Sequence, residues 1–288
     1  MLCPEECECH TAGYYVDCVR RSINAVPLIQ FTNVRLLSLL HYNITLLQKD
    51  SFVSLTELEV LNVTECRLRT IEVGAFNGLT ELTELYTEYN EISELLTGTF
   101  DSMSSLELLD LSYNRIVNLD SDVFSGLVKL NYVDLSANKL QYLHPDTFLG
   151  LPNIKRLTLR RNEALKIPID RNFINSHSLS ELDTSFCNVS SVSVETFANV
   201  SALKWLDLRY NNLRTVNINI LRALPELSTL YLYHNPLQCD CQLQQVWRWC
   251  EDRNIETLDE IWMPACDTPI EVKGTALGDV RERAVRRW

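Results

Sequence analysis

Apolar residues return along the chain with one spacing over most of its length. In most units, aliphatic residues stand at the first, fourth, sixth and eleventh positions, and asparagine stands at the ninth. The unit from Leu106 to Ile116 shows the full pattern, with Asn114 at its ninth position. The period is 24 residues, except for one step lengthened by a residue before Leu179. The nine units begin at Val34, Leu58, Leu82, Leu106, Leu130, Ile154, Leu179, Leu203 and Leu227.

The spacing inside each unit predicts a short strand followed by a turn. Aliphatic and variable residues alternate from the fourth position on, as in a strand with one buried face. The asparagine ends the strand, and its amide can donate to and accept from the main chain of the turn and of the next coil. An apolar residue also recurs further on, where it should fill the wide outer side of a solenoid. These residues are Phe52, Phe76, Phe100, Phe124, Phe148, Phe173, Phe197 and Leu221.

A period of this length is typical of leucine-rich repeats. The predicted fold class is α/β: a leucine-rich repeat solenoid, or horseshoe, with a parallel β-sheet on its concave side. Each coil would bury its apolar face only against its neighbours, so stability should be close to a sum of nearest-neighbour contributions. We expect one continuous body with a cap at residues 1–33, nine repeats at residues 34–237 and a second cap at residues 238–288.

Cysteines are concentrated in the two flanking segments. Their C-x-C spacing favours disulfides over a zinc site, which usually needs paired C-x2-C ligands. Disulfides require an oxidising compartment, so we expect a secreted or extracellular protein. Cys66 and Cys187 stand instead at the asparagine position of their coils and should be buried free thiols. The flanking cysteines are Cys3, Cys7, Cys9, Cys18, Cys239, Cys241, Cys250 and Cys266.

Both flanking segments resemble the cysteine-rich caps of extracellular leucine-rich repeat proteins. In the N-terminal cap the resemblance implies the disulfides Cys3–Cys9 and Cys7–Cys18. In the C-terminal cap it implies Cys239–Cys266, and Cys241–Cys250 would follow. The fourth cysteine usual in such caps is missing and Cys250 is extra, which leaves three pairings open. We also expect a short amphipathic helix from Gln242 to Cys250.

The variable residues of the predicted strands carry the functional signal, because the leucines are scaffold. The outward positions of coils two to five are acidic and tyrosine-rich, whereas those of coils six to eight carry most of the lysines and arginines. Exposed aromatic residues and arginines in register are typical of a binding surface. The alternative is a solvated or self-packed face. The predicted ligand-binding residues of the concave face are Tyr86, Glu88, Tyr89, Asp110, Tyr113, Tyr132, Asp134, Arg160, Arg161, Phe186, Trp205, Arg209, Tyr210, Tyr231 and Tyr233.

Other features narrow the function. Trp262 would either pack inside the C-terminal cap or form the tip of a loop over the concave face. Asn43, Asn62, Asn188 and Asn199 lie in glycosylation sequons. A net charge of −12 makes nucleic acid an unlikely partner. The chain has no long apolar run that could span a membrane. No catalytic or phosphate-binding motif is present, so we expect neither enzymatic activity nor a metal or cofactor.

The repeat length, both caps and the short format resemble the variable lymphocyte receptors of jawless vertebrates and similar receptor-like proteins of invertebrate chordates. The resemblance implies antigen binding by the concave sheet and by a loop of the C-terminal cap. The predicted function is therefore extracellular recognition of a protein or carbohydrate ligand, such as a bacterial surface component, as an innate immune protein. We expect a monomer, secreted or membrane-anchored in its full length. The alternative is a role in cell adhesion, guidance or matrix organisation.

Overall fold

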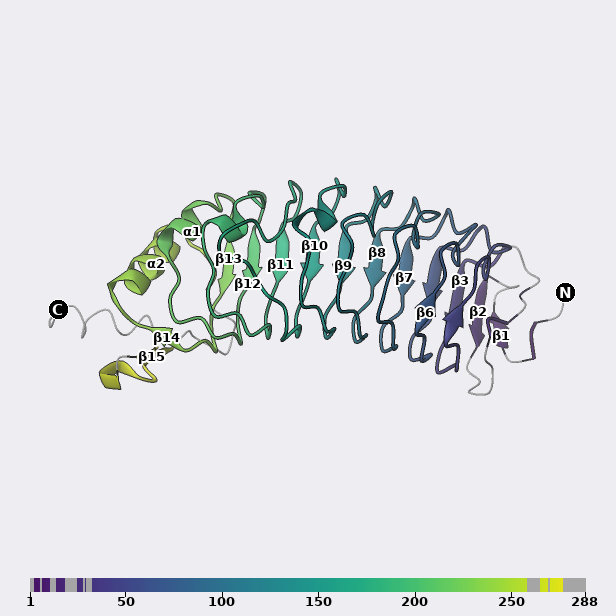
Figure 1. The fold of residues 1–288 in the computed structure, drawn as a ribbon, viewed down its shortest axis with the longest axis horizontal. Coiled ribbons are helices and arrows are strands. Elements are labelled where there is room, and N and C mark those ends of the chain that lie inside the picture. The colour runs from purple at the N-terminus through teal and green to yellow at the C-terminus, as the bar shows by residue number, and fades with distance from the viewer. Residues whose placement is uncertain are drawn as a thin grey trace.

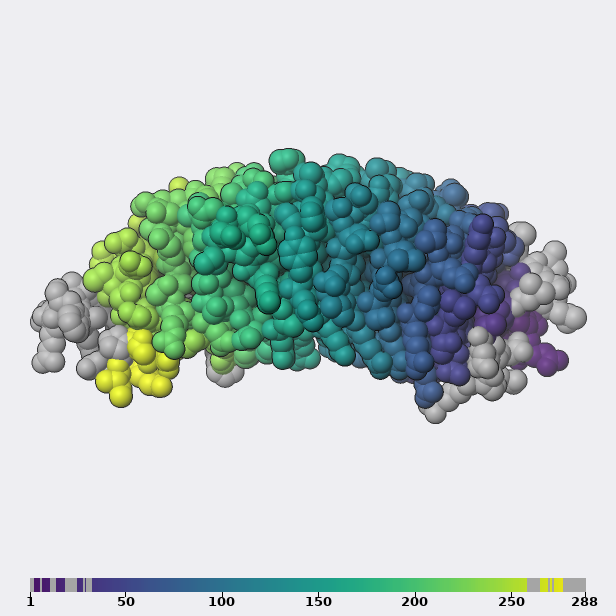
Figure 2. All heavy atoms as spheres, viewed as in Figure 1, coloured from purple at the N-terminus to yellow at the C-terminus, as the bar shows by residue number. Residues whose placement is uncertain are grey.

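The structure is a computed structural model that describes residues 3–5, 7–10, 14–18, 25–27, 29, 33–257, 265–268 and 270–276. The predicted Trp262 contact lies outside these described residues. The coils follow one another along an elongated, arched body (Figures 1 and 2). The predicted leucine-rich repeat solenoid is confirmed.

Each coil contributes one short strand to a single sheet. The sheet has 11 strands, and all neighbouring pairs are parallel except β1 and β2. Most strands have only three residues. They still form a continuous sheet because equivalent positions of neighbouring coils pair with each other, as Leu109 with Val133. The strands of this sheet are β1 (Cys7–His10), β2 (Tyr15–Cys18), β3 (Leu36–Leu39), β5 (Val60–Asn62), β7 (Glu84–Tyr86), β8 (Leu108–Asp110), β9 (Tyr132–Asp134), β10 (Arg156–Thr158), β11 (Glu181–Asp183), β12 (Trp205–Asp207) and β13 (Thr229–Tyr231).

The rest of each coil is mostly turns. Two small parallel pairs lie outside the main sheet, one between β4 and β6 and one between β14 and β15. The remaining elements are β4 (Leu46–Leu47), β6 (Thr70–Ile71), β14 (Leu237–Gln238), β15 (Cys266–Thr268), α1 (Ile218–Arg222), α2 (Cys241–Asp252) and the short 3-10 helices Pro145–Phe148, Glu195–Phe197 and Ile270–Val272.

The core is a stack of aliphatic rows lined on its outer side by phenylalanine rings. The predicted leucines and phenylalanines are buried. Consecutive rings from Phe52 to Phe124 stack with centroids 6.1 to 6.2 Å apart. Strands in a sheet are only about 4.8 Å apart. Because the outer side of each coil is wider than its strand side, the stack must curve with the sheet on the concave side.

The asparagines hold neighbouring coils together. The Asn138 amide nitrogen donates to the carbonyl oxygens of Leu111 and Leu135, at 2.9 and 3.1 Å, and its oxygen accepts from the Ile116 amide at 3.0 Å. Asn90, Asn114, Asn162, Asn211 and Asn235 repeat this arrangement. The bonds run to the preceding coil, not to the following coil as we predicted. Each asparagine thus satisfies buried backbone groups of two coils at once.

Cys66 and Cys187 replace two of these asparagines, and both are buried free thiols as predicted. Their sulfurs donate to the carbonyl oxygens of Leu39 and Leu159 in the preceding coil, at 3.0 and 3.2 Å. Burial raises the pKa of Cys66 to about 11 and that of Cys187 to about 12. Both therefore stay protonated and unreactive near neutral pH.

Disulfides close both ends of the solenoid. The structure contains Cys3–Cys9, Cys7–Cys18 and Cys239–Cys266, which agree with the predicted pairs. The predicted Cys241–Cys250 bond is wrong, because both cysteines are free. They stand nine residues apart in α2, which places their Cα atoms about 13 Å from each other along the axis. A disulfide needs Cα atoms within roughly 7 Å.

The free thiols predict a labelling pattern. In the folded, unreduced protein, iodoacetamide should modify the exposed Cys241 and spare the buried Cys66, Cys187 and Cys250. Denaturation without reductant should then expose all four thiols. Peptide mass mapping measures both states, and a peptide linking Cys241 to Cys250 would contradict the structure.

The asparagine ladder predicts a stability effect. Replacing Asn138 by leucine should lower the free energy of unfolding by roughly 3 kcal/mol or more, because several buried backbone groups would lose their partners. Replacing the adjacent, exposed Lys139 by alanine should change it by no more than about 0.5 kcal/mol. Urea unfolding of both variants measures the difference. Similar effects at the two sites would show that the ladder is not the main bond between coils.

Candidate functional site

The candidate site is the outward face of the main sheet, where columns of residues run across the coils. The strand register fixes each column, since Tyr132 pairs with Arg156 and Asp134 with Thr158. A residue in a column has its counterparts about 4.8 Å away in the two neighbouring coils. The surface therefore consists of regular columns of side chains, and the residue type in each column changes from one coil to the next.

One column lies at the turn, immediately before the asparagine position, and all its residues have a left-handed backbone with φ between 52 and 60°. Such a φ is unfavourable for residues other than glycine. From His41 to Tyr210, the amide of each residue donates to a carbonyl of the following coil, as Tyr113 to Ser136 at 2.8 Å and Ala137 to Arg160 at 2.7 Å. The ladder thus holds the unusual conformation. We call this set the edge column: His41, Glu65, Tyr89, Tyr113, Ala137, Arg161, Phe186, Tyr210 and His234.

Aromatic rings in the edge column stack on one another. The ring centroids of Tyr89 and Tyr113 are 4.2 Å apart, and those of Phe186 and Tyr210 are 4.1 Å apart. His234 extends the second stack at 4.2 Å from Tyr210. The faces are nevertheless open, since Tyr89, Tyr113 and Tyr210 expose 50, 39 and 37% of their surface. The column is thus both self-packed and available to a partner, which combines the two alternatives drawn from the sequence.

Arginines flank the second stack. The Arg160 and Arg161 guanidinium carbons lie 4.6 and 5.4 Å from the Phe186 ring centroid, within cation–π range. Arg156 lies 5.5 Å from the ring of Tyr132 and pairs with Glu181 at 3.5 Å. Arg156 thus contacts a tyrosine of the acidic half across the boundary between coils five and six, and it pairs with an acidic residue inside the basic half.

In the acidic half of the sheet, which consists of coils two to five, tyrosine hydroxyls form hydrogen bonds with neighbouring carboxylates. The Tyr86 hydroxyl donates to Glu84 at 2.7 Å and the Tyr132 hydroxyl to Asp134 at 2.9 Å. Burial, reinforced by these carboxylates, raises the pKa of both tyrosines to about 12. Burial, with the nearby Asp134 and Glu88 carboxylates, raises the pKa of Asp110 to about 6, although hydrogen bonds from Ser112 oppose the shift. A carboxyl that titrates this close to neutrality makes the charge of this half sensitive to mild acid.

The aspartates at the last position of several strands also stabilise the backbone of the turn that follows. An Asp110 oxygen accepts from the Ser112 amide at 2.8 Å, and Asp134 and Asp183 do the same with Ser136 and Ser185. These Asx turns satisfy a backbone group just beyond the strand. Sequence reasoning considered Asp110 and Asp134 only as ligand contacts and missed this role. The available signal was an aspartate recurring at the end of the strand, where Asx turns are common.

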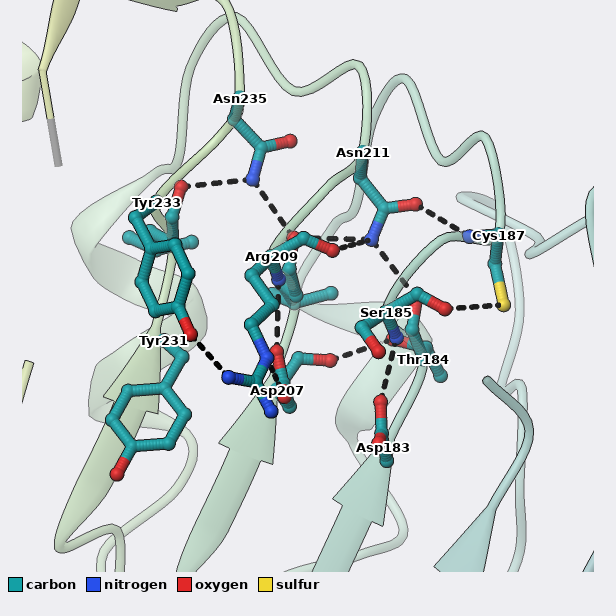
Figure 3. A network of polar contacts seen from close by, with 12 residues as sticks. Asp183, Thr184, Ser185, Cys187, Asp207, Arg209, Asn211, Tyr231, Tyr233 and Asn235 are labelled. Carbon is teal, nitrogen blue, oxygen red and sulfur yellow. Dashed lines mark hydrogen bonds and ion pairs between the residues drawn. The ribbon is translucent and has the colours of Figure 1, made fainter. Parts of the chain in front are cut away.

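A polar network closes the C-terminal end of the sheet (Figure 3). Asp207 is completely buried, and one of its carboxyl oxygens lies 2.5 Å from the Arg209 Nε. Arg209 also donates to the Tyr233 hydroxyl and lies 5.5 Å from the Tyr231 ring centroid. The Tyr231 hydroxyl in turn donates to Glu256 at 3.0 Å, beyond the last repeat. The network thus links the repeats to the C-terminal cap.

The structure divides the predicted contact residues into three groups. Tyr233 is buried and is better described as part of this network than as a ligand contact. Arg209 is half-buried and engaged there as well. The exposed residues are Tyr89, Tyr113, Arg161 and Tyr210. The half-buried residues are Tyr86, Glu88, Asp110, Tyr132, Asp134, Arg160, Phe186, Trp205 and Tyr231.

The sequon asparagines differ in accessibility. Asn188 and Asn199 are exposed, whereas Asn43 and Asn62 are half-buried. The side-chain oxygen of Asn62 accepts from the Thr64 amide and hydroxyl, at 3.0 and 2.5 Å. Within the described residues, no group of three or more histidine, cysteine or acidic side chains could hold a metal. The same part of the chain has no helix long and apolar enough to cross a membrane.

Comparisons with known proteins agree with the fold. A family model described as leucine rich repeat matches residues 32–92, 56–116, 105–164 and 177–237. CD180 antigen of Homo sapiens is 28% identical over 107 residues, covering 36% of this chain and 16% of that protein. The chain therefore matches only a small part of that relative's length.

Two solved structures share the fold over most of this chain. Human 5T4 (trophoblast glycoprotein) superposes with a TM-score of 0.68 at 24% identity, covering 96% of both chains. Mouse RP105, in its complex with MD-1, superposes with a TM-score of 0.66 at 24% identity, covering 86% of this chain and 46% of that one. The likeness extends through both ends of the solenoid in the first case.

The buried carboxylate predicts a pH effect. Burial, with Asp183 nearby, raises the pKa of Asp207 to about 7, although Arg209 opposes the shift. In the unfolded chain its pKa would be about 3.9. Between these values the unfolded state has lost the proton that the folded state retains, so Asp207 should lower the free energy of unfolding by about 1.4 kcal/mol per pH unit as pH rises.

The variant Asp207→Asn isolates this contribution. Its amide oxygen can still accept from the Arg209 amide, as Asn62 accepts from Thr64. In urea unfolding between pH 4 and pH 7, the free energy of unfolding of the wild-type protein should fall relative to that of the variant as the pH rises. Parallel pH profiles would mean that Arg209 keeps Asp207 ionised in the folded state.

Proposed function

The chain belongs to the leucine rich repeat family, and we propose that it is an extracellular recognition protein that binds a protein ligand on the concave face of its sheet. The observation that carries the proposal is the edge column. It exposes stacked aromatic rings and an arginine that the core does not need. Rigid aromatic surface and arginine are the usual anchors of protein interfaces, because they offer large contact area with few rotamers to freeze.

Two further observations support the proposal. The disulfides at both ends require an oxidising compartment, which fits a secreted or cell-surface protein. Mouse RP105, which shares the fold, forms a complex with MD-1. We propose the same class of ligand here. Glycans on the exposed Asn188 and Asn199 would fit this compartment, and removal of N-glycans followed by mass measurement tests their presence.

The finer role that we propose is innate immune recognition of microbial surfaces, as in the receptors that the sequence resembles. A panel of bacterial surface components and cell-surface proteins, probed with the purified chain, tests it. Saturable binding to bacterial components is the expected result. Binding restricted to host adhesion or matrix proteins would favour the alternative role, and binding to neither class would contradict recognition.

Once a ligand is identified, side-chain truncation tests where it binds. Replacing Tyr113, Arg161, Trp205 or Tyr210 by alanine should weaken binding, with one or two variants losing about 2 kcal/mol or more. Unfolding temperatures should change little, because these side chains lie outside the leucine core. Isothermal titration measures affinity, and thermal melting checks the fold.

Tyr142→Ala is the matched control. Tyr142 exposes 42% of its surface, close to the 39% of Tyr113, but lies beyond the strand and turn of its coil. Its removal should leave affinity unchanged. A ligand that depends on Tyr142 and ignores the edge column would place the site on another side of the solenoid.

A further inference from the structure

The edge column has one position without a large side chain. Eight of its nine members carry an aromatic ring, a guanidinium, an imidazole or a carboxylate, and the ninth is Ala137. Ala137 has the same left-handed backbone as its neighbours, with φ of 52°, as in Tyr113. Its Cβ therefore leaves the main chain in the same direction as theirs, but nothing extends from it.

The flanking side chains make their contacts away from Ala137. On one side the Tyr113 ring stacks on Tyr89, with centroids 4.2 Å apart. On the other side the Arg161 guanidinium lies over Phe186, at 5.4 Å. Among the described residues, Tyr113 stacks on no ring other than that of Tyr89. Ring spacings of 4.1 to 4.2 Å are also shorter than the strand spacing of about 4.8 Å, so stacking draws Tyr113 and Phe186, the ring of each stack nearer to Ala137, away from it.

The space that results has a defined width. Tyr113 and Arg161 are two coils apart, which separates their backbones by about 9.6 Å. A planar group between two others needs about 3.5 Å on each side, or about 7 Å in all. A second planar group in the same space would need more than about 10 Å. One flat group therefore fits above the Ala137 methyl.

We propose that this position receives an aromatic side chain of the protein ligand, inserted between Tyr113 and Arg161 as the missing member of the column. A neutral ring there would stack on Tyr113 and take the Arg161 guanidinium on its other face, two contacts that aromatic systems favour. The chain itself shows this combination two coils further on, where Phe186 lies between Arg161 and the Tyr210 ring.

The charges select against other occupants. An arginine or lysine of the ligand would meet Arg160 and Arg161, both on the same side of the space. A carboxylate would be attracted by the arginines but has no aromatic surface to stack on Tyr113. An aliphatic side chain would gain burial but would forgo the cation–π contact. A tyrosine, phenylalanine or tryptophan side chain can stack on Tyr113 and also form the cation–π contact with Arg161.

The Ala137 methyl group is a direct reporter. The full chain with 13C-methyl alanine is titrated with N-acetyl-L-tyrosinamide, and N-acetyl-L-leucinamide serves as the non-planar control. A ring above Ala137 shields the methyl, so the tyrosine probe should shift its proton resonance upfield and saturably. The leucine probe should not. An Ala137 methyl that ignores the tyrosine probe, or responds equally to both probes, would overturn the proposal.

Substitutions at the same position complete the test. Ala137→Tyr fills the space with a ring that Tyr113 shows to be compatible with this backbone, and it should abolish binding of the tyrosine probe. Ala137→Ser keeps the space open and should retain it. Circular dichroism and thermal melting establish that both variants fold. If Ala137→Tyr does not fold, Arg161→Ala removes one wall and should weaken probe binding about tenfold or more.

This inference rests on the proposed function for its ligand, yet the two fail separately. Probe binding without any protein ligand would leave the site intact and contradict the proposed function. A protein ligand that depends on Tyr113 and Tyr210 but binds Ala137→Tyr with unchanged affinity would support the function and overturn the inserted ring.

Discussion

The fold depends on a buried amide that bonds two coils at once. An asparagine such as Asn138 closes its own turn and holds the preceding coil, so a three-residue strand can be repeated without long segments of regular structure. The same bonds fix the turn, where the residue before each asparagine takes a left-handed backbone. The outward residues of the edge column are therefore set in place by an interaction inside the molecule.

Aromatic residues act differently on the two sides of each coil. On the outer side the phenylalanine rings are about 6.1 Å apart and fill a core that must widen. On the sheet side the stacked rings of the edge column are 4.1 to 4.2 Å apart. The wider outer spacing curves the stack into the arch seen in Figure 2. On the sheet side the shorter spacing brings the edge-column rings into contact. The curvature and the aromatic surface are thus two results of the same spacing.

Sequence reasoning reached the repeat, the asparagine ladder, the buried phenylalanines and the two thiols at Cys66 and Cys187, because each depends on a residue type at a fixed period. It failed where a position alone does not determine a contact. Tyr233 shares the outward pattern with exposed residues but is drawn inward by Arg209. Cys241 and Cys250 were paired by elimination, although the helix expected between them already kept them too far apart. The left-handed edge column has no sequence signature among its side chains, since tyrosine, arginine and alanine all occur in it.

The edge column also bears on how such a surface can change. Its side chains contact close neighbours, as Tyr89 contacts Tyr113 and Phe186 contacts Tyr210, and all its members share one backbone conformation whatever their side chain. A substitution at one place therefore alters one step of the surface and leaves the scaffold and the more distant steps as they were. Side chains as different as tyrosine, arginine, histidine, glutamate and alanine already stand on this one backbone conformation, so the chemistry of the outward surface is separate from the fold that carries it.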